Sequence, residues 1–137
     1  MSRYILAIDD DPGRYDELRR LLEDRQGGVP VVLRVACCSA CVAAHLPRAV
    51  AVLLDHDLSA DPCTCGEWAD TDDSRGYLPA VAAVGVPVIV TSASMPENRA
   101  WLTARLCAAG ARVRQHSANE IQPEWHWIGW LWTQGVL

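Results

Sequence analysis

The stretch YILAIDDD, residues 4–11, joins a short apolar run to three consecutive aspartates. A continuous apolar run of this length is typical of a strand that is buried on both faces of a sheet. The stretch AVAVLLDHD, residues 49–57, has the same form. Two such strands, each ending in acidic residues, predict a parallel α/β sheet with a polar edge.

The rest of the chain alternates between apolar runs and segments with helical spacing. Further strands are expected at residues 31–36, 86–90 and 112–115. Helices are expected from Pro12 to the glycines at 27–28 and at residues 39–46, 77–84, 96–109 and 122–134. Five strands that alternate with five helices predict a doubly wound parallel sheet, because parallel neighbours are joined by helical crossovers.

The length of 137 residues predicts a single domain that spans residues 1–137. Its long interruption is the polar, turn-rich segment 58–76, and a loop of this length is typically functional. No apolar run reaches the roughly 18 residues of a membrane span, and the acidic start is unlike a signal peptide. We therefore expect a cytoplasmic protein with no membrane partner.

The chain carries a formal net charge of -5, which argues against broad DNA binding, because such binding needs clustered cations. A phosphate-containing small molecule or an RNA terminus is still a suitable ligand. All 12 basic residues counted as lysine or arginine are arginines. This excludes every reaction that depends on a lysine amine.

Side chains capable of metal or phosphate chemistry follow three of the predicted strands. They are Asp9, Asp10 and Asp11 after the first strand, Asp55, His56 and Asp57 after the third, and Thr91 and Ser92 after the fourth. Ligands of doubly wound sheets bind at the carboxyl ends of the strands, so these side chains should meet. Converging carboxylates repel one another unless a hard cation neutralises them, which predicts Mg2+ or Mn2+.

The roles expected within this pocket differ from residue to residue. The predicted metal ligands are Asp9, Asp10, Asp55 and His56. His56 and Asp57 are also candidates for moving a proton, and Thr91 and Ser92 for binding a phosphoryl oxygen. A competing interpretation is that single aspartates, above all Asp11 and Asp57, are helix caps or solvated loop acids.

Several motifs together resemble the response-regulator receiver domain over nearly the whole chain. They are AIDDD after the first strand, LLDHD after the third, a hydroxyl pair after the fourth and AAGA before the fifth. The resemblance implies the flavodoxin-like strand order 2-1-3-4-5, an acidic pair at Asp9 and Asp10 and a phospho-accepting Asp55. The receiver's lysine at the end of the fifth strand is missing, because residues 114–117 read RQHS.

The segment LDHDL, residues 54–58, is similar to a divergent branch, the cyclic-phosphate-processing receiver domains. That resemblance implies action on cyclic phosphates, such as RNA ends or cyclic nucleotides, with Asp55, His56 and Asp57 as catalytic residues. The second motif of the branch contains a histidine, whereas residues 91–94 here read TSAS. His116, after the fifth strand, is a candidate for the missing imidazole.

Two hypotheses on function therefore stay open. The first is a metal-dependent phosphoesterase that opens cyclic phosphodiesters. The second is a non-catalytic receiver-like module that signals by binding a partner. A conventional phosphorylated regulator is a third interpretation, and the missing lysine argues against it.

Four cysteines form two closely spaced pairs, Cys38 with Cys41 and Cys63 with Cys65. Four thiolates in this arrangement can make a tetrahedral structural Zn2+ site. The second pair lies in the segment 58–76, which would have to fold back across the first strand to reach the first pair. Adventitious thiols and a disulfide are the alternatives.

The C-terminal segment, residues 122–137, is rich in tryptophan. The helical stripe expected to pack on the sheet consists of Ile121, Trp125, Ile128 and Trp132. Trp127 and Trp130 are then expected nearer the surface. These tryptophans either cover the core or a crevice within the monomer, or make the surface formed by the last two helices and the fifth strand a homodimer interface.

Overall fold

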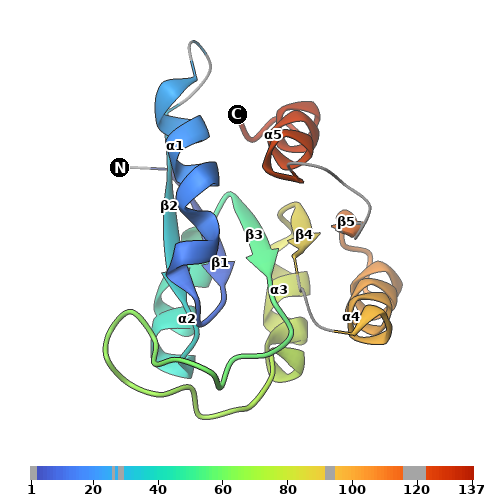
Figure 1. Ribbon diagram of the computed structural model, residues 1–137. Coiled ribbons are helices and arrows are strands. Elements are labelled where there is room, and N and C mark those ends of the chain that lie inside the picture. The colour runs from blue at the N-terminus through green and yellow to red at the C-terminus, as the bar shows by residue number, and fades with distance from the viewer. Residues whose placement is uncertain (1–2, 26, 28–29, 92–94, 116–122) are drawn as a thin grey trace.

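Five parallel strands form one sheet in the computed structural model, which describes residues 3–25, 27, 30–91, 95–115 and 123–137. The strands are β1 (Arg3–Ile8), β2 (Val31–Ala36), β3 (Ala51–Leu54), β4 (Val88–Val90) and β5 (Val113–Gln115). Their order is β2-β1-β3-β4-β5, and every pairing is parallel (Figure 1). The expected doubly wound sheet and its strand order are confirmed.

Helices cover both faces of this sheet. They are α1 (Asp16–Asp24), α2 (Ser39–His45), α3 (Leu78–Val84), α4 (Pro96–Ala108) and α5 (Pro123–Thr133), with 3-10 helices η1 (Pro12–Tyr15), η2 (Leu46–Arg48) and η3 (Arg75–Tyr77). One core layer joins the sheet to α2, α3 and α4, and the other joins it to α1 and α5. Within the described ranges, no helix has the length and apolar character needed to cross a bilayer.

Element boundaries differ from the expected ones where proline intervenes. The helix expected from Pro12 begins as η1, and the strand expected at 86–90 begins at Val88. Pro87 has no N–H to donate to a neighbouring strand, although its carbonyl accepts from the Val52 N–H at 2.9 Å. The strand expected at 49–54 begins at Ala51 because η2 precedes it.

The orientation expected for α5 is wrong. Trp127 and Leu131 are buried, with exposed fractions of 4% and 0%, whereas Trp125 and Trp132 are 57% and 56% exposed. Trp127 and Leu131 are four residues apart and so share one helix face, which packs into the core layer shared with α1. The apolar side chains on every face of this helix left the sequence pattern without a clear polar side to orient it.

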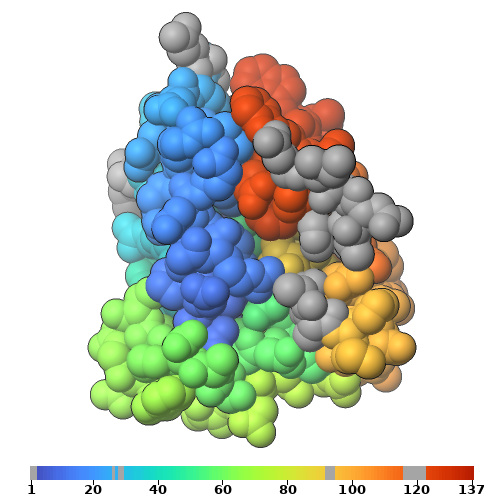
Figure 2. Space-filling model, viewed as in Figure 1, coloured from blue at the N-terminus to red at the C-terminus, as the bar shows by residue number. Residues whose placement is uncertain are grey.

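The segment 58–76 leaves β3, crosses the carboxyl end of β1 and returns to α3. It forms no helix or strand before η3, but the Leu58 N–H donates to the Asp72 carbonyl at 2.9 Å, which closes the base of the loop. Figure 1 shows this green segment curving past α2, and Figure 2 shows its surface directly below the blue surface of η1 and α1. The loop therefore borders the carboxyl edge of the sheet.

Candidate functional site

Three polar residues stand level with one another at the carboxyl ends of β1, β3 and β4. Asp9, Asp55 and Thr91 each donate their backbone N–H to a neighbouring strand, at 3.1, 3.0 and 2.9 Å. The parallel ladder thus extends one residue beyond the strands proper, and it fixes where each side chain starts. This regular register brings together residues that are far apart in the sequence.

The three buried aspartates converge as expected. Oxygen atoms of Asp9, Asp10 and Asp55 lie within 4.8 Å of one another, and the residues are only 1%, 5% and 6% exposed. Among the described residues these three form the carboxylate group at this edge, and His56 is not part of it. The predicted ligand set is therefore brought together except for His56.

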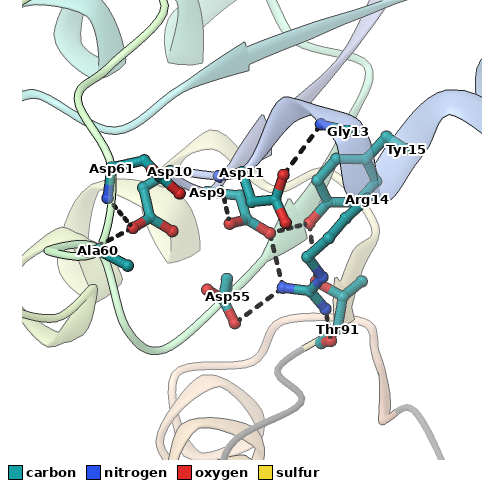
Figure 3. A network of polar contacts seen from close by, with 10 residues as sticks. All are labelled: Asp9, Asp10, Asp11, Gly13, Arg14, Tyr15, Asp55, Ala60, Asp61 and Thr91. Atoms are coloured by element: carbon teal, nitrogen blue, oxygen red, sulfur yellow. Dashed lines mark hydrogen bonds and ion pairs between the residues drawn. The ribbon is translucent and has the colours of Figure 1, made fainter.

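Arg14 supplies a cation that the sequence analysis did not anticipate. Its Nη1 lies 2.7 Å from Asp9 Oδ2 and 3.2 Å from Asp55 Oδ1, and its Nη2 donates to the Thr91 carbonyl (Figure 3). The guanidinium thus joins the ends of β1, β3 and β4. The sequence contains only a weak signal for this contact, which is that Arg14 follows the acidic strand end closely enough for its side chain to reach back to Asp9.

Tyr15 completes the buried side of the pocket. Its hydroxyl donates to Asp9 Oδ2 at 2.7 Å and lies 3.1 Å from Thr91 Oγ1. The residue is fully buried. Asp9 Oδ1 accepts from the Asp11 N–H at 3.0 Å, so both oxygens of Asp9 are hydrogen-bonded.

Burial raises the pKa values of two carboxyl groups in this pocket. Burial, and then the charge of Asp55, raise the pKa of Asp9 to about 7 against the lowering effect of Arg14 and Tyr15. Burial also raises the pKa of Asp55, again opposed by Arg14. The single guanidinium of Arg14 therefore does not bring the pKa values of Asp9 and Asp55 back to their ordinary range.

Asp10 faces the long loop. Its Oδ2 accepts from the backbone N–H groups of Ala60 and Asp61, at 2.7 and 2.9 Å (Figure 3). Two amide donors hold this carboxylate in place and leave Oδ1 free of the loop contact. The loop therefore positions one of the three aspartates.

His56 lies on the other side of the strand end from the aspartates. Its Nδ1 is 2.6 Å from Asp57 Oδ1, and its Nε2 accepts from Arg75 Nε at 3.2 Å. The Arg75 guanidinium in turn stacks 4.3 Å from the Trp101 ring centroid. Arg75 and Trp101 line a groove of about 400 Å3 between α3 and α4, and the lining includes none of the aspartates.

The other residues predicted for the site lie in different places. Asp11 is exposed and accepts from the Gly13 N–H at 3.1 Å, so it caps η1, as the competing interpretation expected. Asp57 is largely exposed and contacts His56. Thr91 lines the pocket as expected, whereas Ser92 and His116 lie outside the described residues.

The donor set fits a hard divalent cation. Three ionised carboxylates against one guanidinium leave two negative charges uncompensated, which equals the charge of Mg2+ or Mn2+. Carboxylate oxygens are the ligands these ions prefer. The raised pKa values of Asp9 and Asp55 agree with this, because burial without sufficient positive charge disfavours both carboxylates.

The strand order and the acidic strand ends together define a receiver-like α/β domain. Among solved structures, the chain is similar to the phosphorylated cyanobacterial phytochrome response regulator RcpA. The two are 17% identical with a TM-score of 0.61, over 98% of this chain and 94% of that one. This likeness shows the fold, and the strand order is the one that the receiver resemblance implied. No protein-family model and no curated protein matches the sequence.

Proposed function

We propose that this protein is a receiver-like domain that binds Mg2+ or Mn2+ together with a phosphoryl group. The ligands proposed are cyclic phosphates, either at RNA ends or in cyclic nucleotides. The observation that carries the proposal is the Arg14 guanidinium set between Asp9 and Asp55, at 2.7 and 3.2 Å. A cation and a carboxylate cluster side by side offer the two partners that a metal-bound phosphoryl group needs.

Each residue of the pocket has a distinct part in binding. Asp9, Asp10 and Asp55 would hold the metal, which when bound polarises a phosphoryl oxygen and lowers the pKa of a coordinated water. The Arg14 fork pairs with two phosphoryl oxygens, since planar guanidinium matches phosphate geometry. The Thr91 hydroxyl, now 3.1 Å from the Tyr15 oxygen, donates to a further oxygen.

Turnover of a cyclic phosphate is the catalytic form of this proposal. Water adds to phosphorus, the ring P–O bond breaks, and the departing oxygen takes up a proton. The contact of 2.6 Å between His56 and Asp57 favours an oriented imidazole for that proton transfer. Because His56 lies outside the aspartate group, this form requires that Arg75 release His56 Nε2 and that the imidazole turn toward the pocket.

The alternative is a non-catalytic module that binds a phosphorylated ligand and signals by contacting a partner. The observation favouring it is that Asp57 and Arg75 hold His56 outside the aspartate group. In this alternative the pocket still takes metal and phosphate, but no described imidazole reaches them. Metal binding is thus common to both forms, and turnover separates them.

The test measures binding and turnover separately with a 2',3'-cyclic nucleotide and Mg2+, Mn2+ or a chelator. Asp55→Asn should abolish metal-dependent binding, whereas Asp16→Asn, which changes an exposed aspartate of α1, should leave it intact. Metal-dependent turnover that is lost in both Asp55→Asn and His56→Ala supports the enzyme. Binding without turnover supports the module, and a wild-type protein that binds neither metal nor nucleotide contradicts the proposal.

A further inference from the structure

A second group of metal-type side chains lies away from the acidic pocket. The Sγ atoms of Cys38, Cys41, Cys63 and Cys65 all lie within 4.8 Å of one another. Cys38 and Cys63 are buried, Cys41 is partly buried and Cys65 is exposed, so the group sits at the protein surface with one side covered. The function proposed above makes no use of it.

The spacing of the sulfurs matches tetrahedral coordination and not a disulfide. Four sulfurs at about 2.3 Å from a central zinc ion lie roughly 3.8 Å from one another. The Sγ atoms of Cys38 and Cys65 are 3.6 Å apart, close to that value. A disulfide would need about 2.05 Å and would use the sulfurs in pairs, whereas here four converge on one point.

The backbone around the four cysteines has the form of two metal-binding turns. Cys38 caps α2 and Cys41 lies in its first turn, so both sulfurs point from the start of one helix. Cys63 begins a tight turn that the Gly66 N–H closes by donating to the Cys63 carbonyl at 2.8 Å, and Cys65 lies within this turn. Gly66 has φ of +94°, a conformation that favours glycine.

Hydrogen bonds to this turn hold it against β2 and α2. The Cys37 N–H donates to Cys63 Sγ at 3.3 Å, which stabilises negative charge on that sulfur. The Thr64 hydroxyl donates to the Val35 carbonyl at 2.7 Å. These contacts bring the loop back across β1, which allows the two cysteine pairs to meet.

We propose that Cys38, Cys41, Cys63 and Cys65 bind a structural Zn2+ ion that clamps the segment 58–76 onto the start of α2. Binding replaces the thiol protons, which pass to the solvent, by four Zn–S bonds. Soft thiolate ligands select zinc over the hard cation of the acidic pocket, so the two sites take different metals. The zinc proposal is independent of the proposed function.

The clamp has a consequence for the rest of the loop. Asp70 accepts from the Ser39 hydroxyl at 2.6 Å and so fixes the loop beyond the cysteines, while Ala60 and Asp61 donate to Asp10 before them. The segment 58–76, which has no helix or strand before η3, would thereby be attached to the rest of the domain at three places. Loss of zinc should loosen the middle attachment and weaken the contacts to Asp10.

The test is the metal content and Co2+ spectrum of the whole chain, purified under reducing conditions and supplied with zinc. We expect one zinc ion per chain, and Co2+ should give the d–d and charge-transfer bands of a tetrahedral tetrathiolate site. Cys65→Ser should lose both, because it removes one of the four ligands. It should still fold, because Cys65 is exposed and its change spares the core. The matched control is Cys107→Ser, an exposed cysteine of α4 outside the group, which should keep both.

Folding is monitored separately, by far-ultraviolet circular dichroism of each variant. Folded Cys65→Ser without zinc supports the site, and increased hydrogen exchange confined to the segment 58–76 supports the clamp. A folded, reduced wild-type protein that binds no zinc overturns the proposal. Zinc retained in folded Cys65→Ser and Cys38→Ser, or iron bound at the four sulfurs in place of zinc, also overturns it.

Discussion

Nη1 of Arg14 lies 3.2 Å from Oδ1 of Asp55, so a guanidinium that follows β1 pairs with the carboxylate that follows β3. The same nitrogen contacts Asp9 at 2.7 Å. A pocket in a chain without lysine therefore still has a cation, which η1 supplies. The balance between this cation and a bound metal governs the first prediction.

Replacing Arg14 by glutamine should destabilise the metal-free protein and strengthen Mg2+ binding. Asp9 and Asp55 lose their counter-ion, and we expect a cost of about 1–3 kcal/mol, below that of a fully buried pair because the Arg14 side chain is 26% exposed. Urea unfolding with and without Mg2+ and calorimetric titration measure both effects. The control Arg19→Gln removes an exposed pair with Asp16 and should change stability by less than about 0.5 kcal/mol. Equal stability of Arg14→Gln and wild type without metal would contradict the role of Arg14 as the counter-ion of Asp9 and Asp55.

The stability of the metal-free protein should fall as the pH rises from about 4 to about 7. The pKa of Asp9 is about 7 in the folded protein against an ordinary value of 3.8, so the folded state holds a proton that the unfolded state has lost. The raised pKa of Asp55 acts in the same direction. Unfolding by urea across this range measures the slope, and Asp9→Asn should flatten it.

The affinity for Mg2+ should depend on pH in the opposite direction to the stability of the metal-free protein. Because Mg2+ binds the ionised carboxylates, its binding releases protons below about pH 7 and its affinity should increase with pH up to that value. Calorimetric titration in two buffers of different ionisation enthalpy counts the protons released. Mg2+ affinity that is constant between about pH 5 and about pH 7 would contradict the assignment of Asp9 as a ligand.

Tyr15→Phe should destabilise the protein by about 1–3 kcal/mol, because a buried carboxylate loses a hydrogen-bond donor. The hydroxyl that is removed lies 2.7 Å from Asp9 Oδ2. The matched control is Tyr77→Phe, whose hydroxyl donates to the neutral Cys37 carbonyl at 2.8 Å and should matter less, by roughly 0.5–1.5 kcal/mol. Urea unfolding at a pH well above 7, where Asp9 is ionised, compares the two variants. Equal destabilisation, or a larger effect of Tyr77→Phe, would argue against the Tyr15 hydrogen bond to an ionised Asp9.

The two kinds of tryptophan on α5 should respond differently to truncation. Trp127→Ala should cost about 3–5 kcal/mol, because Trp127 is 4% exposed and packs in the core layer with α1. Trp132→Ala should cost less than about 0.5 kcal/mol in the monomer, because Trp132 is 56% exposed. Chemical unfolding at low protein concentration tests this comparison.

The homodimer that we propose through the α4-β5-α5 surface would bury Trp125 and Trp132, which are both more than half exposed in the monomer. Sedimentation velocity over a range of concentrations should show association that Trp125→Ser and Trp132→Ser weaken. An exposed tryptophan on the segment 58–76, Trp68, provides the matched control. A wild-type protein that stays monomeric at all concentrations would remove this proposal.

The sheet was predictable because its strands are continuous apolar runs that end at charged residues. Residues 4–8 and 49–54 are each apolar throughout, so each run can be recognised by itself as a strand buried on both faces. The order of the strands came from the resemblance to receivers, and the structure has the same order. The convergence of Asp9, Asp10 and Asp55 followed from that topology alone.

The direction of individual side chains was harder to predict. Asp9 and Asp10 are consecutive and both reach the carboxylate group, whereas His56, which follows Asp55, contacts Asp57 and Arg75 instead. The alternation of side chains along a strand therefore could not have separated His56 from the metal ligands in advance, because the loop contacts of Asp10 and the Arg75 contact of His56 decide where these side chains point. The role of Arg14 could not have been predicted either, because its reach depends on where η1 begins after Asp11.

The origin of the Arg14 cation in η1 also sets the route by which the pocket could influence the rest of the molecule. A ligand that draws the guanidinium away from Asp9 and Asp55 pulls first on η1 and on α1, which follows it directly. The core side of α1 packs in one layer with Trp127 and Leu131 of α5. Coupling between a ligand in the pocket and the C-terminal helix would therefore pass through the core layer that α1 shares with α5, so a substitution at Leu18 or Leu22 would uncouple the two while leaving the pocket side chains in place.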